Sequence, residues 1–260
     1  MLYFYRFTGG NALETEKMVE QLAALREKSL LLFGIFRFPY RFEGKKRLQT
    51  AIRQYYRMQE MCDGITYFYA DGMLEMLEPG TSIIKANEIF SAMEEEIING
   101  LETIVEIPGE MNIDLHDIES FMHAKKGPFF LHTIEGTVFD EPLKYLLAKP
   151  YLPHDFAEGQ QMIVNIGYSK DVNMDAYRQI NLRLHDLFHK ADLFKMGTYC
   201  IDEPGQRIKI TLLLNGISDP YPRPEKPRLL SLQPFSAKSK WQTLLRAMRN
   251  PHAANRKAQP

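Results

Sequence analysis

Residues 81–106, TSIIKANEIFSAMEEEIINGLETIVE, form the longest stretch of this chain in which apolar residues recur at helical spacing. The pattern stops at Pro108-Gly109. A helix of about 26 residues is about 39 Å long, well beyond the usual length of about 11 to 12 residues. We therefore expect it to join two domains rather than to cover one sheet. The apolar residues are Ile84, Phe90, Ile97, Leu101, Ile104 and Val105.

Strand and helix patterns alternate on the N-terminal side of this stretch. Short apolar and aromatic runs predict buried strands at Leu2–Phe7, Leu30–Arg37 and Ile65–Tyr69. Amphipathic segments predict helices at about Ala12–Lys28, with Asn11 as N-cap, and at about Glu43–Met61. Strands separated by helices favour right-handed crossovers, and therefore a parallel, Rossmann-like sheet with helices on its faces.

A second α/β unit is expected on the C-terminal side, beginning with a short helix after Asp114. We expect residues 1–80 to form the first domain, 81–111 the long helix and its exit, 112–218 the second domain, and 219–260 a proline-rich linker and basic tail. The further helices are expected at Glu141–Leu147 and Asp175–His189, and the strands at Phe129–Ile134, Gln161–Gly167, Leu193–Ile201 and Arg207–Leu214.

The composition excludes several classes of protein. With 260 residues, 45% hydrophobic and 25% charged, the chain is neither disordered nor collagen-like. No apolar run approaches the ~18 residues that span a bilayer, so we expect a cytoplasmic protein. Cys62 and Cys200 are far apart in the sequence and give no disulfide framework.

Charge is distributed unevenly between the body and the tail. The segment after Glu225 contains eight Lys or Arg residues and no Asp or Glu, which leaves residues 1–225 acidic. An acidic body disfavours nucleic acid as a partner, because that affinity depends on neutralising phosphates.

Common catalytic and binding motifs are missing: GxxxxGK[ST], GxGxxG, HExxH and GxSxG do not occur. His185 and His189 have the i, i+4 spacing of a metal-binding pair, with Asp186 nearby. Ile180 and Leu184 already define the buried stripe of that helix, so a solvated flank is the alternative and no metal is expected.

Asn112, Asp114 and Asp117 follow the long helix and open the next one. In a structural interpretation, Asp114 is an N-cap and Asp117 is a first-turn acid favoured by the helix dipole. In a functional interpretation, the two carboxylates orient a water molecule for attack on a phosphate. The spacing alone does not choose between them.

Three segments resemble the cell-division GTPase FtsZ, a relative of tubulin. Residues 38–47, FPYRFEGKKR, are similar to the family's strand-to-helix junction, 108–117, PGEMNIDLHD, to its synergy loop, and 194–216 to its closing pair of strands. The likeness runs from about Leu2 to Ile217. It implies the tubulin/FtsZ GTPase fold, in which the long helix is the central one.

The resemblance also implies a truncated family member with a degenerate nucleotide site. The family's first three strands and first glycine-rich loop have no counterpart, and its next phosphate loop corresponds to residues 9–16, GGNALETE. Ala70 stands where the family has asparagine. No cofactor is expected, with GTP or GDP as the alternative. The residues at the nucleotide-contacting positions are Gly9, Gly10, Glu43, Arg47, Asn87 and Ser91.

In the family the synergy loop reaches the nucleotide of the adjacent subunit in a filament. The resemblance therefore implies that Asn112, Asp114 and Asp117 act in trans. We expect an accessory of a cytoskeletal or cell-division filament, or a homo-oligomer, that is not an autonomous GTPase. The alternative is a GTP-binding or GTP-hydrolysing filament protein whose site is completed by another chain.

Two segments are candidate partner surfaces. With the fourth strand of the family at a sheet edge, Leu2–Phe7 would expose Tyr3, Phe4 and Tyr5 to a second copy or an FtsZ-like partner. In the tail, helical spacing of apolar residues among basic ones predicts a membrane or protein contact. The alternative for the tail is a helix packed on its own body or a disordered end. These apolar tail residues are Trp241, Leu244, Leu245 and Met248.

Overall fold

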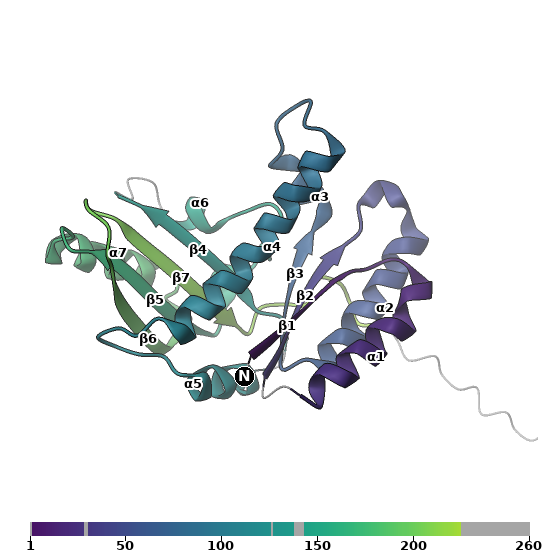
Figure 1. The fold of residues 1–260 in the computed structure, drawn as a ribbon, viewed down its shortest axis with the longest axis horizontal. Helices are drawn as coiled ribbons and strands as arrows, with labels where there is room; N and C mark the ends of the chain where they lie inside the picture. The colour runs from purple at the N-terminus through teal and green to yellow at the C-terminus, as the bar shows by residue number, and fades with distance from the viewer. Residues whose placement is uncertain (1, 29–30, 126, 138–142, 225–260) are drawn as a thin grey trace, which may run out of the picture. The chain divides into compact units, whose positions relative to one another are not determined.

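The long helix expected from the sequence is α4, Ile83–Glu106, which lies between two β-sheets (Figure 1). Ser82 caps its N-terminus by accepting a hydrogen bond from the Lys85 N–H. The structure, a computed structural model, describes residues 2–28, 31–125, 127–137 and 143–224. The predicted tail contact through Trp241 and Met248 lies outside the described residues.

The first sheet is parallel, with strand order β1-β2-β3. Its strands are β1, Leu2–Thr8, β2, Leu31–Phe38, and β3, Gly64–Tyr69. Helices α1, Thr15–Arg26, and α2, Lys45–Met61, cover one face, and α4 covers the other. This arrangement follows from side-chain alternation along β2, where Leu32 and Phe36 pack with α1 and α2 while Phe33 and Ile35 pack with α4.

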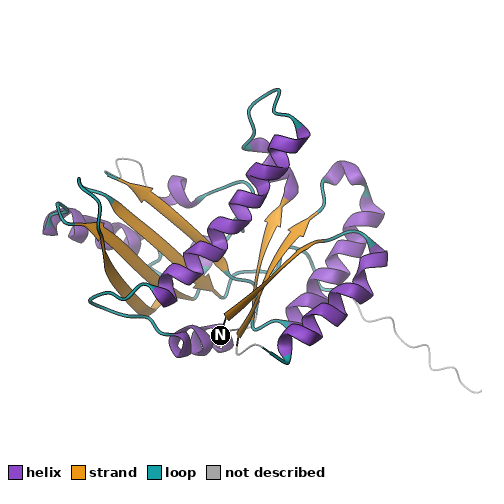
Figure 2. Ribbon diagram, viewed as in Figure 1, coloured by secondary structure: helices purple, strands orange, loops and turns teal. Residues whose placement is uncertain are grey.

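The second sheet is mixed, with order β4-β7-β5-β6 (Figure 2). Strand β7 is antiparallel to β4 and β5, whereas β5 and β6 are parallel. Its strands are β4, Phe130–Gly136, β5, Gln161–Ser169, β6, Asp192–Ile201, and β7, Ile208–Asn215. Its helices are α5, Leu115–Ala124, α6, Leu143–Leu147, and α7, Met174–Leu187.

Helix α4 shares one hydrophobic core with both sheets. Phe90, Ile97 and Leu101 are buried in a cluster that includes Phe33 of β2 and Leu131 of β4. Residues 1–223 accordingly form one compact unit. The domain boundaries at residues 80 and 111 stay a prediction. No helix among the described residues is long and apolar enough to cross a membrane.

Two predicted helices begin later than expected, because short 3-10 turns precede them. Asn11 caps the turn Ala12–Glu14 rather than α1 itself, since its side chain accepts from the Leu13 N–H. Glu43 closes the turn Arg41–Glu43, and Gly44, with φ of 96°, separates that turn from α2. The sequence also gave no expectation for helix α3, Ala70–Glu75.

The first residues of the proline-rich segment after Ser218 contact the body of the protein. The Tyr55 hydroxyl donates to Asp219 Oδ1 at 3.0 Å, and Gln59 Nε2 donates to the same oxygen at 2.8 Å. The ring of Tyr221 packs against Phe38 at 5.1 Å between centroids. Residues 219–223 therefore lie against α2 and the first sheet, an arrangement that proline spacing alone does not reveal.

His132 on β4 makes the stability of the fold dependent on pH. Its side chain is 5% exposed, and Nε2 has no hydrogen-bond partner among the described residues. Burial, followed by the charge of Lys149, lowers the pKa of His132 to about 4. The unfolded chain therefore binds a proton between about pH 6.5 and 4 that the folded chain does not, and stability falls as the pH falls through that window.

We expect wild type to lose about 2 kcal/mol more free energy of unfolding than His132→Leu between pH 7 and pH 5. The measurement is urea unfolding of both proteins at the two pH values. Acidic groups elsewhere titrate alike in both and cancel in the difference. Equal losses would contradict a buried neutral imidazole.

Candidate functional site

The acidic loop between α4 and α5, residues 107–114, is fixed against strand β6. The Thr198 N–H donates to the Met111 carbonyl at 3.0 Å, and the Gly109 N–H donates to Asn112 Oδ1 at 2.7 Å. A Cβ atom on Gly109 would lie 1.7 Å from the Thr198 carbonyl oxygen, so only glycine fits there. Asn112 thus holds the loop that presents Asp114.

Asp114 and Asp117 cap the start of α5 reciprocally. Asp114 Oδ1 accepts from the Asp117 N–H at 2.8 Å, and Asp117 Oδ2 accepts from the Asp114 N–H at 3.1 Å. Lys195 of β6 lies 2.8 Å from Asp117. Partial burial would raise the pKa of Asp117, but the bonds from Lys195 and the Asp114 N–H outweigh it and lower that pKa.

The structural interpretation of this pair is therefore confirmed, and the chemical one stays a prediction. Asp117 is engaged by Lys195 and is half-buried, whereas Asp114 and Asn112 are exposed. Asp114 can use one carboxylate oxygen as a cap and still present a charged face to an outside ligand. The loop is held firmly enough to position that carboxylate.

The Gly9-Gly10 loop follows the carboxyl end of β1, where parallel α/β sheets bind ligands. The Gly10 N–H donates to Gln54 Oε1 at 2.8 Å, and Gln54 Nε2 donates to Thr15 Oγ1 at 2.8 Å. A Cβ atom on Gly10 would lie 2.6 Å from Cγ of Arg47. Side chains of α2 therefore occupy one side of the loop and bind the amide that a phosphate would need.

Glu43 and Arg47 are close to each other and bound internally. Glu43 accepts from the Tyr40 N–H at 2.9 Å, and its other oxygen pairs with Arg47 Nε at 2.7 Å. The sequence missed Gln54, although Ala51, Gln54 and Met58 share the buried side of α2. The sequence signal for Gln54 was a polar residue at a position of α2 where the helical spacing predicts a buried side chain.

Asn87 and Ser91 lie one turn apart on the exposed side of α4. On the same helix, Glu95 pairs with Arg6 at 3.0 Å and Glu94 pairs with Arg37 at 3.5 Å. Burial raises the pKa of Glu94, against the opposing effect of Arg37. No motif predicted the pair of Glu94 with Arg37, although the position of Glu94 between Phe90 and Ile97 in the apolar stripe was a signal for it.

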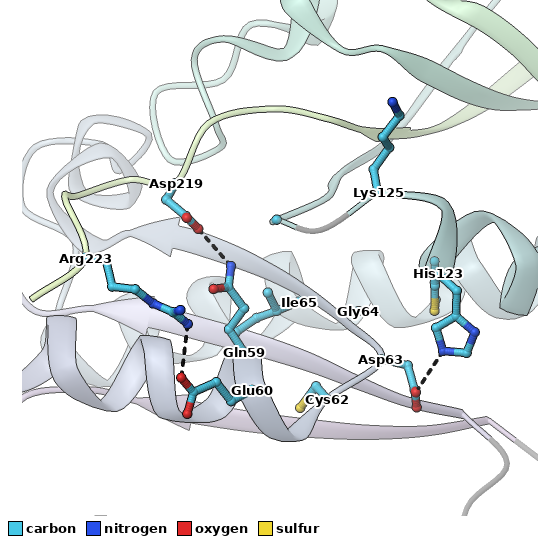
Figure 3. A pocket seen from close by; sticks show the side chains of 12 residues that line it. Gln59, Glu60, Cys62, Asp63, Gly64, Ile65, His123, Lys125, Asp219 and Arg223 are labelled. Atoms are coloured by element: carbon cyan, nitrogen blue, oxygen red, sulfur yellow. Dashed lines mark hydrogen bonds and ion pairs between the residues drawn. The ribbon is translucent and has the colours of Figure 1, made fainter. Parts of the chain in front are cut away.

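A cavity of about 560 Å³ opens at the other end of the first sheet, where α2 and α5 end and β3 begins (Figure 3). Asp63, with a 3% exposed side chain, accepts from the Leu32 N–H at 2.9 Å, pairs with Arg26, and lies 3.2 Å from His123 Nε2. Burial by itself raises the pKa of Asp63, but the bonds from Arg26, Leu32 and His123 lower it overall.

The charges of this cavity are largely paired within the chain. Glu60 pairs with Arg223 at 3.1 Å, and Gln59 donates to Asp219 (Figure 3). No sequence pattern predicted this cavity, since its residues come from three distant segments, around Asp63, His123 and Asp219. His185 lies in the last turn of α7, but His189 lies in the turn beyond its end at Leu187, with Nδ1 3.3 Å from the Asp186 carbonyl oxygen. No set of three metal-ligating side chains occurs among the described residues.

The two groups of candidate residues lie at opposite ends of α4. The strands of the first sheet, drawn as arrows in Figure 2, run in the same direction, toward the end at which the Gly9-Gly10 loop follows β1. The acidic loop follows the C-terminus of α4. A helix of 24 residues is about 36 Å long. Within one chain, Asp114 and Gly10 therefore cannot contact the same nucleotide.

A parallel sheet, a long central helix and a second mixed sheet, joined in this order, define the fold of FtsZ/tubulin GTPase domains. FtsZ from M. jannaschii, solved as an empty dimer, has a TM-score of 0.65 at 16% identity over 82% of this chain and 62% of that one. CetZ from Methanosaeta thermophila has a TM-score of 0.60 at 18% identity, covering 97% of this chain and 68% of that one.

Sequence comparison agrees with the fold. Cell division protein FtsZ of Methanothermobacter thermautotrophicus is 24% identical over 217 residues, covering 82% of this chain and 56% of that protein. FtsZ of Buchnera aphidicola subsp. Schizaphis graminum is 21% identical over 217 residues, covering 80% and 55%. No protein-family model matches. These relatives and the fold together place the chain in the FtsZ/tubulin superfamily, and the chain spans about 55% of the length of the curated relatives it matches.

Proposed function

We propose that this chain is a cytoplasmic FtsZ/tubulin-like assembly protein that contacts a nucleotide held by another subunit and does not hold GTP by itself. The observation that carries the proposal is the contrast between its two loops. The acidic loop is exposed and held on β6, while the Gly10 amide and the space beside it are taken up by Gln54 and Arg47.

Electrostatics support the same proposal. Exposed Glu14 and Glu16 follow the Gly9-Gly10 loop. Negative side chains at this end of the sheet repel a triphosphate. Asn87 offers no ring for a base, and base stacking on an aromatic side chain is worth about 1 to 3 kcal/mol.

Exposed apolar side chains at the carboxyl ends of the strands favour a protein contact there. Leu13 is 91% exposed, Ile83 82% and Phe42 75%. Ile107 and Met111 in the acidic loop are also exposed. A head-to-tail contact between such ends would bury these side chains. The neighbours in fold include a CetZ2 protofilament and a TubZ two-stranded filament.

A composite GTP site is the second candidate function. Gly9, Gly10, Glu43 and Arg47 remain together at one end of the sheet, so another chain could complete a site around them. In that case the chain would bind and hydrolyse GTP only in a complex. A strand of that other chain could then pair with the edge of β1 that faces away from β2.

The test is co-sedimentation with FtsZ from the organism that encodes this chain, assembled with GTP. We expect the chain to pellet only with polymer and, at substoichiometric amounts, to shorten the filaments, because it presents no nucleotide for the next subunit. The matched control is the same mixture of the chain and FtsZ with GDP in place of GTP, in which no polymer forms. A chain that stays in the supernatant with full-length filaments would contradict the proposal.

A further inference from the structure

Strand β1 has a neighbour on one side only among the described residues, namely β2. The Gly9 N–H donates to the Arg37 carbonyl of β2 at 2.9 Å. Backbone groups alternate in direction along a strand, so Tyr3, Tyr5 and Phe7 also direct theirs toward β2. The backbone groups that point outward belong to Leu2, Phe4, Arg6 and Thr8.

We propose that this outer edge pairs with the same strand of a second copy, antiparallel, with Tyr5 on the two-fold axis. In this register Leu2 lies opposite Thr8 and Phe4 lies opposite Arg6 of the second copy. Every outward-pointing residue of β1 then exchanges hydrogen bonds with another. A two-fold contact of this kind is self-complementary and closed.

Other antiparallel registers are less favourable. A shift by two residues in one direction moves Thr8 beyond Leu2, the first described residue of the second copy's β1. A shift in the other direction places Arg6 opposite Arg6 and Leu2 opposite Gly10, whose N–H already donates to Gln54. Like charges directly opposite each other destabilise a pair of strands. The register centred on Tyr5 is therefore the one that the backbone pattern and the single charge of β1 favour.

Side chains on both faces of β1 suit this pairing. Toward α1 and α2, Tyr3 would lie opposite Phe7, in the closer non-hydrogen-bonded positions where aromatic pairs contribute most. Toward α4, Arg6, which pairs with Glu95 within its own chain, would lie opposite Phe4 of the second copy, where a cation–π contact adds to that pair. All these aromatic side chains are half-buried in the single chain, so pairing would cover the rest of them.

The proposed pairing of β1 needs neither nucleotide nor FtsZ, so it is tested on the chain alone and separately from the proposed nucleotide contact. The first test is disulfide formation in a Cys200→Ser background. Burial raises the pKa of the remaining Cys62 thiol to about 12, so it reacts slowly. We expect Tyr5→Cys to cross-link with itself, and a mixture of Tyr3→Cys with Phe7→Cys to cross-link although neither does so alone.

The second test is the mass in solution at about tens of micromolar, measured by light scattering without nucleotide. We expect twice 30.2 kDa for wild type and for Arg6→Ala, and 30.2 kDa for Arg6→Pro. Proline removes an outward N–H that the β1–β2 ladder does not use, while alanine removes the same side chain and keeps the N–H. The proposal would be overturned by a monomeric wild type or by a dimeric Arg6→Pro variant. It would also be overturned if Tyr3→Cys or Phe7→Cys cross-linked alone as well as in the mixture.

Discussion

Asp114→Asn should fold as well as wild type and lose about 10²- to 10⁴-fold of the GTP hydrolysis that occurs at its contact with a nucleotide-bearing FtsZ subunit. Asparagine is as good an N-cap as aspartate, so the bond from the Asp117 N–H and the start of α5 are kept. Asparagine has no carboxylate to orient or polarise a water molecule. The substitution therefore separates the structural role of Asp114 from the chemical one.

The measurement is phosphate release from a mixture of GTP-bound FtsZ with each variant, beside thermal unfolding of the variants alone. Asp114→Ala is the matched control, because it loses the cap at a cost of about 1 kcal/mol as well as the carboxylate. Both variants should lose the hydrolysis, and only the alanine variant should lose stability. If Asp114→Asn supports the same turnover as wild type, Asp114 is a helix cap and nothing more.

The parts of the fold that could be read from the sequence are those set by local patterns. The apolar periodicity of 81–106 gave α4, and the aromatic run Leu2–Phe7 gave β1 with its parallel partner. Asp114 and Asp117 were recognised as a helix start because an N-cap and its first-turn acid lie three residues apart in the sequence. Such signals need no knowledge of distant contacts.

The parts that the sequence did not reveal depend on residues far apart in the chain. The segment 219–223 packs on α2 through Tyr55 and Gln59, more than a hundred residues earlier. Asp63 joins α1, β2 and α5 through Arg26, Leu32 and His123. Both sets are single contacts without a repeating spacing, so no periodicity could report them.

The candidate site divides in the same way. The resemblance placed Gly9, Gly10, Glu43 and Arg47 together, and the structure shows that they are neighbours. The resemblance did not predict that the Gly10 N–H donates a hydrogen bond to the Gln54 side chain. That fact required the position of α2 beneath the loop, which depends on how the Ala51 face of the helix packs on the first sheet.

The isolated chain should bind GTP with a dissociation constant of about 1 mM or larger, equivalent to a binding free energy of about −4 kcal/mol or one closer to zero. Three features lower the affinity together. The Gly10 amide already donates to Gln54, Glu14 and Glu16 repel phosphates, and no aromatic side chain of α4 stacks on the base at Asn87. The first two act on the triphosphate and the third acts on guanine.

Equilibrium dialysis of labelled GTP against the purified chain, with Mg²⁺ and no partner, tests this most directly. We predict at most about 10% more label on the protein side of the membrane at a protein concentration of about 100 µM, one tenth of the expected dissociation constant or less. Retention of about one GTP per chain with a micromolar dissociation constant would contradict the account, since it would require the Gly9-Gly10 loop to release Gln54 and Arg47 and hold a triphosphate on its own.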